Sequence, residues 1–198
     1  MADHPVDWNG GRLMELLWYV SRATGLIALL LLTATILLGI TGVMRFTAPG
    51  WPRFVLAHLH RNLALLTLAF LVVHVSTAVI DPYAGIRWID TVVPFVSGYQ
   101  TFWLGLGVVA IELLIALVAT SLLRTRMGLR SWRAVHWAGY GCWPIAVIHG
   151  LGIGGQDTQT LWMLAPTLGC VALVVGALIW RVLVTPAGEA GRVQVTRR

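Results

Sequence analysis

The chain contains no lysine and few charges of any kind. Charged residues make up 11% of its 198 residues, and all 14 basic residues are arginines. Hydrophobic residues make up 58%, and the mean hydropathy is +0.79. An average soluble domain has about 25% charged residues, so the scarcity of charge excludes a soluble globular protein and predicts an integral membrane protein.

Cysteine is also scarce, and two common sequence signals are missing. Cys142 and Cys170 each lie alone in an apolar stretch, where a thiol packs as a small apolar side chain, so we expect neither a disulfide nor a catalytic thiol. No glycine-rich nucleotide-binding loop is present. Residues 1–12 lack the basic region and cleavage site of a signal peptide, so we expect the first helix to be retained.

Five apolar stretches are long enough to cross a membrane. A helix needs about 20 residues to cross a hydrocarbon core of roughly 30 Å, and these runs lack the alternation of lipid-facing strands, which excludes a β-barrel. Nine of the ten tryptophans lie near the ends of the stretches, as membrane-interface anchors do, and Trp143 is the exception. The sequence predicts an all-α integral membrane bundle of five helices at residues 24–44, 59–80, 102–123, 132–151 and 161–184.

The positions of the arginines indicate the orientation of the chain. Short cytoplasmic loops retain basic residues, whereas acidic residues contribute little to topology. With five spans, eleven arginines share one side, and the other side holds Arg12, Arg22 and Arg87. The pI near 10.4 is therefore a topology signal and not evidence for nucleic acid binding. We expect a multi-pass protein of the cell (plasma or inner) membrane, with the N-terminus outside and the C-terminus in the cytoplasm.

The chain divides into three parts. Residues 1–15 are expected to form an extracytoplasmic N-terminal segment, and residues 16–184 the transmembrane domain. Within that domain, residues 81–100 are too apolar for a linker with no other role, so we expect them to lie flat on the outer face of the transmembrane domain. Residues 185–198 contain proline, glycine and charge without apolar periodicity, which predicts a disordered cytoplasmic tail.

Four histidines lie inside the apolar stretches, His60 and His74 in the second and His136 and His149 in the fourth. One such histidine alone is more often a packed residue that hydrogen-bonds to a neighbouring helix. Ionisable groups in hydrocarbon need partners, however, and mark function by default. His60 and His136 both lie near the arginine-rich side, and the other two lie near the opposite side. Four histidines at two matching depths predict two metal sites.

The spacing of the histidines predicts an irregular fourth span. His60 and His74 are 14 residues apart, which gives roughly 21 Å of rise and a rotation mismatch of about 40°, so they face nearly the same way. His136 and His149 are 13 residues apart, which would leave them about 140° apart on an ideal helix. The segment GYGCWP at residues 139–144 contains two glycines and a proline, so we predict a kink or altered winding there.

Two imidazoles at each level restrict the kind of metal group. A zinc site needs several ligands that converge on one ion at about 2 Å. Two axial imidazoles on opposite faces satisfy a haem, whose porphyrin edge fills apolar space between helices. The pairing therefore predicts two stacked b-type haems. Iron with both axial positions occupied has no vacant site for oxygen, so the expected role is electron transfer.

Two segments carry a resemblance to a known family: LHRNLALLTLAFLVVH, and WRAVHWAGYGCWPIAVIH followed by GLGIGGQDT. They resemble the ferric reductase-like transmembrane domain family, which includes NADPH oxidases, metalloreductases and the haem subunit of the bacterial methionine sulfoxide reductase system. The resemblance covers roughly residues 16–185, and the paired spacings of 14 and 13 are its most specific element. It implies that His60, His74, His136 and His149 are the haem ligands.

The sequence also departs from that family. Members often have six spans, and this chain looks like one without the first. The larger oxidases and metalloreductases carry a cytoplasmic FAD and NADPH module after the last helix, whereas 14 residues follow Val184 here. We therefore expect one subunit of a redox system, whose donor is a separate protein or a quinol. A partner flavoprotein with FMN or FAD, or a quinone, is the expected redox partner, and ferric iron is a further possible outer acceptor.

Haem propionates are negatively charged and need cationic or hydrogen-bonding partners near the membrane surface. Arg61 and Arg133 flank the inner histidines. Arg22 and Arg87 are the candidates for the outer haem. We therefore add these four arginines to the predicted cofactor-binding residues.

Two polar residues and two other functions stay open. His58 lies two residues before His60 and hence on a different helical face, so we interpret it as an interfacial residue. Glu112 is a protonated, hydrogen-bonded carboxyl or a proton-relay group.

One alternative function is a quinol- or ascorbate-linked oxidoreductase of the cytochrome b561 type, which also stacks two haems between four helices. The other is a non-redox transporter or assembly factor whose histidines pack or bind a metal ion.

Overall fold

The computed structural model describes residues 8–43 and 52–195 of the chain. Within these ranges every regular element is a helix and no strand occurs, so the all-α prediction is confirmed. The elements are α1 (Trp8–Val43), α2 (Arg53–Ile80), η1 (Trp88–Thr91), α3 (Thr101–Leu122), α4 (Leu129–Trp137), α5 (Gly139–Ile153), η2 (Gly155–Gln159) and α6 (Leu161–Val195), where η marks a short 3₁₀ helix.

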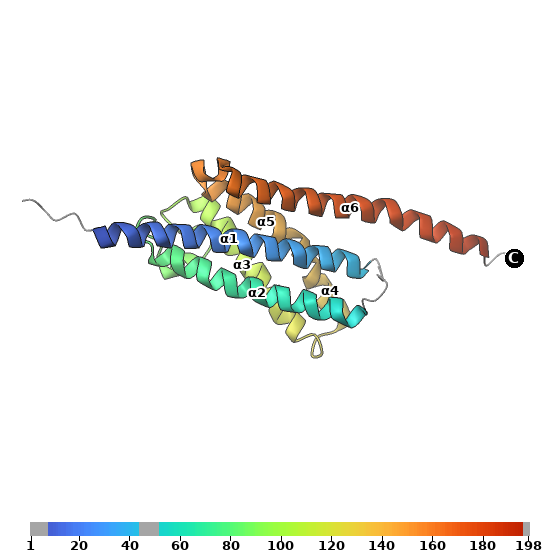
Figure 1. Cartoon of the computed structure of the whole chain (residues 1–198). Helices are drawn as coiled ribbons and strands as arrows, with labels where there is room; N and C mark the ends of the chain where they lie inside the picture. The colour runs from blue at the N-terminus through green and yellow to red at the C-terminus, as the bar shows by residue number, and fades with distance from the viewer. Residues whose placement is uncertain (1–7, 44–51, 196–198) are drawn as a thin grey trace, which may run out of the picture.

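Four of the described helices are long and apolar enough to cross a membrane. Their apolar parts are Gly11–Gly42, Phe54–Ile80, Thr101–Leu122 and Leu161–Leu183. Each provides the continuous apolar run that a hydrocarbon core of about 30 Å requires, and they correspond to four of the five predicted spans. The chain is therefore a multi-pass membrane protein. In Figure 1 the long helices lie side by side along one axis, α1 begins at one end of the bundle, and α6 ends at the other.

The fourth predicted span, residues 132–151, is not a single helix. α4 ends at Trp137 and α5 begins at Gly139. The backbone N–H of Ala138 bonds to the carbonyl of Val135, three residues back, at 2.9 Å, so the winding tightens between the two helices. A glycine at the start of α5 lowers the cost of leaving the regular helical path. The prediction of altered winding is confirmed. In Figure 1, α4 and α5 in succession return the chain to the end of the bundle where α6 begins.

Two helix ends differ from the prediction. α1 begins at Trp8, well before the predicted start at residue 24. α6 continues to Val195, so the helix extends into residues 185–195, where the sequence predicts a disordered tail. A helix that has already formed extends at little cost, because each added residue gains a hydrogen bond after nucleation is complete. Residues 1–7, residue 44 and residues 196–198 of the predicted segments lie outside the described residues.

The interior of the bundle contains a cluster of buried apolar side chains from α1, α3, α5 and α6. Its members are Leu32, Leu114, Leu117, Cys142, Trp143, Val147, Cys170 and Val174. α1 packs along α2 and α6, and α3 packs along α5. The indole N–H of Trp143 donates to Thr33 Oγ1 on α1 at 2.9 Å. Trp143, the one tryptophan that interface anchoring does not explain, is therefore part of the core.

The connection from α2 to α3, residues 81–100, is held by two sets of contacts. Arg87 and Asp90 form an ion pair at 2.7 Å around η1, and the Asp90 residue is 1% exposed. Hydrogen bonds from Arg87 hold the pKa of the Asp90 carboxyl below its usual value. The ring of Phe95, whose φ is +63°, packs on Gly105 of α3. The connection therefore has a defined conformation, at the end of the bundle where α1 begins (Figure 1).

Candidate functional site

The four intramembrane histidines lie in two pairs. The ring centres of His60 on α2 and His136 on α4 are 6.1 Å apart. Those of His74 on α2 and His149 on α5 are 6.5 Å apart. We term His74 and His149 the outer pair and His60 and His136 the inner pair, after the predicted orientation of the chain. The structure brings together the same two pairs that the sequence spacing predicts.

The separation of the rings fits two imidazoles bound to one metal ion. A metal–nitrogen bond is about 2 Å long, and a ring centre lies roughly 1.2 Å behind the bonded nitrogen, so two rings in line across one ion have centres about 6.4 Å apart. Aromatic rings in direct contact can also lie at this distance. The protonation of the ring nitrogens therefore decides whether the pairs are suited to metal binding.

Three of the four rings hydrogen-bond through Nδ1 to a backbone carbonyl of a neighbouring helix. A carbonyl oxygen only accepts, so Nδ1 carries the proton and the lone pair is on Nε2. Metal-ligating histidines have this arrangement, in which the second nitrogen donates to a carbonyl or carboxylate. The Nδ1–oxygen distances are 2.9 Å for His60 and Thr35, 2.7 Å for His74 and Ser21, and 2.8 Å for His149 and Trp103.

Each of these three carbonyls is followed, four residues later, by a glycine that faces the histidine ring. A Cβ atom on Gly107 would lie 2.5 Å from the ring of His149, and one on Gly25 would lie 2.9 Å from the ring of His74. A Cβ atom on Gly39 would lie 3.7 Å from the ring of His60. At Gly107 and Gly25 the missing side chain lets the imidazole lie against the backbone and reach the carbonyl, whereas at Gly39 the ring approaches less closely. We term each such carbonyl with its glycine a glycine notch.

Reasoning from the histidines alone misses the glycine notches, although the sequence contains a signal for two of them. Gly25 and Gly39 are 14 residues apart, the same spacing as His60 and His74. α1 packs antiparallel along α2 (Figure 1), so equal spacings place one notch opposite each histidine. A glycine spacing that repeats the histidine spacing in the preceding apolar stretch would have predicted these positions.

His136 differs from the other three histidines. Its Nδ1 atom is buried and has no hydrogen-bond partner among the residues that the structure describes, and the same holds for Nε1 of Trp132. The rings of Trp132 and His136 are stacked with centres 4.8 Å apart and planes 23° apart. The guanidinium of Arg124 lies over the Trp132 ring, 4.6 Å from its centre. His136 is thus positioned by stacking, not by a glycine notch.

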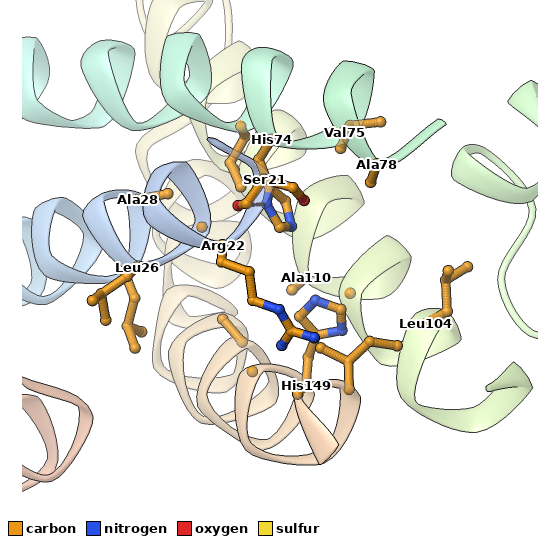
Figure 2. Close-up of a pocket in the computed structure, with 18 of the residues that line it drawn as sticks. Ser21, Arg22, Leu26, Ala28, His74, Val75, Ala78, Leu104, Ala110 and His149 are labelled. Carbon is orange, nitrogen blue, oxygen red and sulfur yellow. Dashed lines mark hydrogen bonds between the residues drawn. The ribbon is translucent and has the colours of Figure 1, made fainter. Parts of the chain in front are cut away.

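A cavity of about 550 Å³ lies beside the outer pair, within the usual size range of ligand pockets. Figure 2 shows the rings of His74 and His149 and the side chain of Arg22 turned toward the same space between the helices. Its apolar walls include Leu29, Leu32, Leu71, Val108 and Leu114, and polar groups come from Tyr83, Tyr99, Gln100, Gln156 and Asp157. Apolar walls with a polar group on one side suit a flat apolar molecule with a charged edge, which fits a porphyrin.

The four predicted cofactor-binding arginines have different surroundings in the structure. Arg22 lines the cavity, and its side chain is 17% exposed, forms an ion pair with Asp157 at 3.3 Å, and lies over the Trp18 ring at 5.0 Å. Arg87 is 66% exposed, pairs with Asp90, and is not among the residues that line the cavity. Arg61 on α2 and Arg133 on α4 are exposed.

Four other side chains of the predicted spans belong to neither histidine pair. His58 and Glu112 are exposed on the surface of the bundle. Cys142 and Cys170 are buried free thiols, and Cys142 donates to the Ala110 carbonyl at 3.3 Å. Within residues 8–43 and 52–195, no cluster of three or more histidine, cysteine, aspartate or glutamate side chains is placed to hold a metal ion. A zinc-type centre therefore has no ligand set in this part of the chain.

The described residues form an all-helical membrane protein with two pairs of facing imidazoles. Comparison with known proteins gives its family. Residues 24–147 match the family described as the ferric reductase like transmembrane component. The match covers more than half of the chain, which therefore belongs to this family and is a membrane electron-transfer component. It includes His60, His74 and His136 and ends two residues before His149. Comparisons with curated proteins and with solved structures find no match.

Proposed function

We propose that this chain is a di-haem b-type membrane cytochrome that carries electrons across the membrane as one subunit of a redox system. The observation that carries the proposal is the two imidazole pairs at 6.1 and 6.5 Å, in which three rings have Nδ1 occupied by a carbonyl and Nε2 left for a metal. Membership of a ferric reductase-like family supports the same proposal.

His60 and His136 would hold one haem, and His74 and His149 the other. A haem bound there would supply one-electron chemistry. The residues of the chain would fix the orientation of the ligands. The glycine notches set the rotation and the tautomer of three imidazoles. The buried side chains between the two levels, with Trp143 bonded to Thr33, keep the interior apolar.

Arg22 is the best placed of the four arginines to bind a carboxylate at the edge of the outer site. It lies in the cavity wall with little exposure, and Trp18 and Asp157 hold its guanidinium in place. A guanidinium forms strong charge-assisted hydrogen bonds with carboxylates. Arg61 and Arg133 remain proposed partners on the inner side. Arg87 would serve the outer site only after leaving Asp90.

We propose a donor on the cytoplasmic side and an acceptor outside the membrane. The donor is a separate flavoprotein, with FMN or FAD, or a quinol. A membrane potential that is negative inside favours outward electron movement by about 2.3 kcal/mol per 100 mV for a full crossing.

Haem content and absorption spectra of the purified chain test the ligand assignment. Expressed with a sufficient haem supply, the protein should bind two low-spin haems, and His74→Ala should remove one of them. His58→Ala is the matched control, since His58 is exposed and belongs to neither pair, and it should retain both. A colourless wild-type protein, or a His74→Ala variant with full haem content, would overturn the assignment and favour a non-redox membrane protein.

Donor tests in membrane vesicles distinguish a flavoprotein partner from a quinol. Vesicles that contain the chain are mixed either with a reduced flavoprotein or with a quinol, and reduction of the haem bands is followed in time. Fast reduction by the flavoprotein from the cytoplasmic face supports the proposed direction. Reduction by quinol or ascorbate alone at the same rate would instead favour the cytochrome b561-type function.

A further inference from the structure

The inner and outer pairs differ in the hydrogen bonding of their imidazoles. Both rings of the outer pair donate from Nδ1 to a backbone carbonyl. In the inner pair only His60 does so. Nδ1 of His136 is buried and has no partner in the described ranges 8–43 and 52–195. The ligand environments of the two levels are therefore unequal.

The register between α3 and α5 shows which residue of α3 lies at the depth of His136. His149 Nδ1 meets the Trp103 carbonyl at 2.8 Å, and Cys142 Sγ meets the Ala110 carbonyl at 3.3 Å. Seven residues forward on α3 thus correspond to seven residues back on α5, as expected for antiparallel helices. Continued by six residues in each direction, this register places Ala116 at the depth of His136, although a straight fourth span would turn His136 about 140° away from the direction of His149.

No glycine notch exists at that position. Thr120 stands four residues after Ala116, where the other notches have glycine, and its hydroxyl donates to the Ala116 carbonyl at 2.7 Å. The fourth span is also broken at Ala138, between His136 and the part of the helix that keeps the register. At the depth of His136, α3 therefore offers no glycine-backed carbonyl like those that the other three imidazoles use.

The charges near the two pairs differ as well. Beside the outer pair, Arg22 is neutralised by its ion pair with Asp157. On the inner side, Arg124 lies over Trp132, which stacks on His136. No carboxylate lies within ion-pair distance of Arg124 in the part of the chain that the structure describes. The inner pair therefore lies near a cation without a counter-charge.

We propose that the inner site holds its haem at a higher reduction potential than the outer site, an inference that rests on the proposed function. A hydrogen bond from Nδ1 makes a ligating imidazole more basic. A more basic ligand stabilises the oxidised iron, which carries the larger positive charge, and so lowers the potential. The outer site has two such ligands and the inner site has one. Arg124 is exposed to solvent, so it adds only a screened effect, which acts in the same direction.

The order of potentials determines where an electron rests. An electron that enters from the cytoplasmic side stays mainly on the inner haem until the outer one can pass it on. Electron transfer from the inner to the outer haem is then energetically uphill. The membrane potential, or an acceptor with a higher reduction potential, would drive it.

Redox titration of single-site variants tests the order of the two potentials. His74→Ala retains the inner site, and His60→Ala retains the outer site. The midpoint potential of the haem in His74→Ala should be higher than that in His60→Ala, and both should match the two waves of the wild-type protein. Two haems with equal potentials, or with the outer one higher, would overturn this inference and leave the proposed function intact. Absence of haem from the wild-type protein would overturn the proposed function itself.

A pair of glycine variants on α1 tests the physical cause and does not depend on removing a ligand. In Gly25→Ala the new Cβ meets the His74 ring at 2.9 Å, so the ring must move away from the Ser21 carbonyl. In the control, Gly42→Ala, the new Cβ meets nothing within 4 Å. Gly25→Ala should raise the lower potential or release the outer haem alone, and Gly42→Ala should change neither potential. Two retained haems with unchanged potentials in Gly25→Ala would contradict the hydrogen-bond explanation.

Discussion

The hydrogen bond between Trp143 and Thr33 predicts a measurable energetic coupling between α5 and α1. Thr33→Val keeps a branched side chain but leaves the buried indole N–H of Trp143 without its acceptor. A buried donor without a partner costs about 1–3 kcal/mol in soluble proteins, whereas hydrogen bonds between membrane helices average about 0.6 kcal/mol and reach about 1.7 kcal/mol. We therefore expect Thr33→Val to lower the free energy of unfolding by roughly 1 kcal/mol.

A double-mutant cycle isolates this hydrogen bond from the other effects of the substitution. Thr33 also donates to the Leu29 carbonyl at 2.8 Å, and valine loses that bond too. The loss occurs equally in the wild type and in the Trp143→Phe background, so it cancels in the cycle. The remaining coupling should be about 0.6 kcal/mol, the average found between membrane helices, and no more than about 1.7 kcal/mol.

The four proteins of the cycle can be compared by unfolding in mixed micelles of a mild detergent and dodecyl sulfate. Far-ultraviolet circular dichroism reports the loss of helix, and the haem absorption reports the sites separately. Thr33→Val should cost more in the wild type than in the Trp143→Phe background. An equal cost in both backgrounds would refute the reasoning, because it would mean that the two side chains do not interact.

Three further changes have defined outcomes. Gly107→Ala places a Cβ 2.5 Å from a ring of the outer pair and should lower the haem content toward one per chain, whereas Gly141→Ala, which meets nothing within 4 Å, should leave two. Arg22→Gln should weaken retention of the outer haem during purification, and unchanged haem content would contradict its proposed role. Arg87 lowers the pKa of Asp90 from an ordinary value of 3.8, so the ion pair should persist above that pH and be lost only as the pH falls through the lower folded value. Protease cleavage of residues 81–100 measured against pH checks this, and Asp90→Asn should be cleaved at pH 7 as the wild type is in acid.

Much of the fold follows from the sequence because burial in a membrane imposes simple demands. Long apolar runs must form helices, and four of the five predicted spans are single helices in the structure. The depths of the histidines follow from helix rise alone, and the pairs His60 with His136 and His74 with His149 are observed. The irregular winding of the fourth span follows from the angle that an ideal helix would leave between its two histidines.

The parts that escape prediction depend on contacts between helices. The Ser21 and Trp103 carbonyls carry no sequence signal of their own, because every residue has a carbonyl. The missing partner of His136 depends on the register between two helices and on the break at Ala138, and neither can be read from one segment. The pairing of Arg87 with Asp90 arises from the local turn at η1, which charge counting does not reveal.

The two glycine notches of α1 restrict how the length of that helix can vary. One residue inserted between Gly25 and Gly39 would rotate everything after it by about 100° and advance it by about 1.5 Å. One notch would then face away from its histidine while the other stayed in place. Insertions before Ser21, within the first turns of α1, would disturb neither. Homologous chains should therefore differ in length at the beginning of this helix and keep a constant interval between its two glycines.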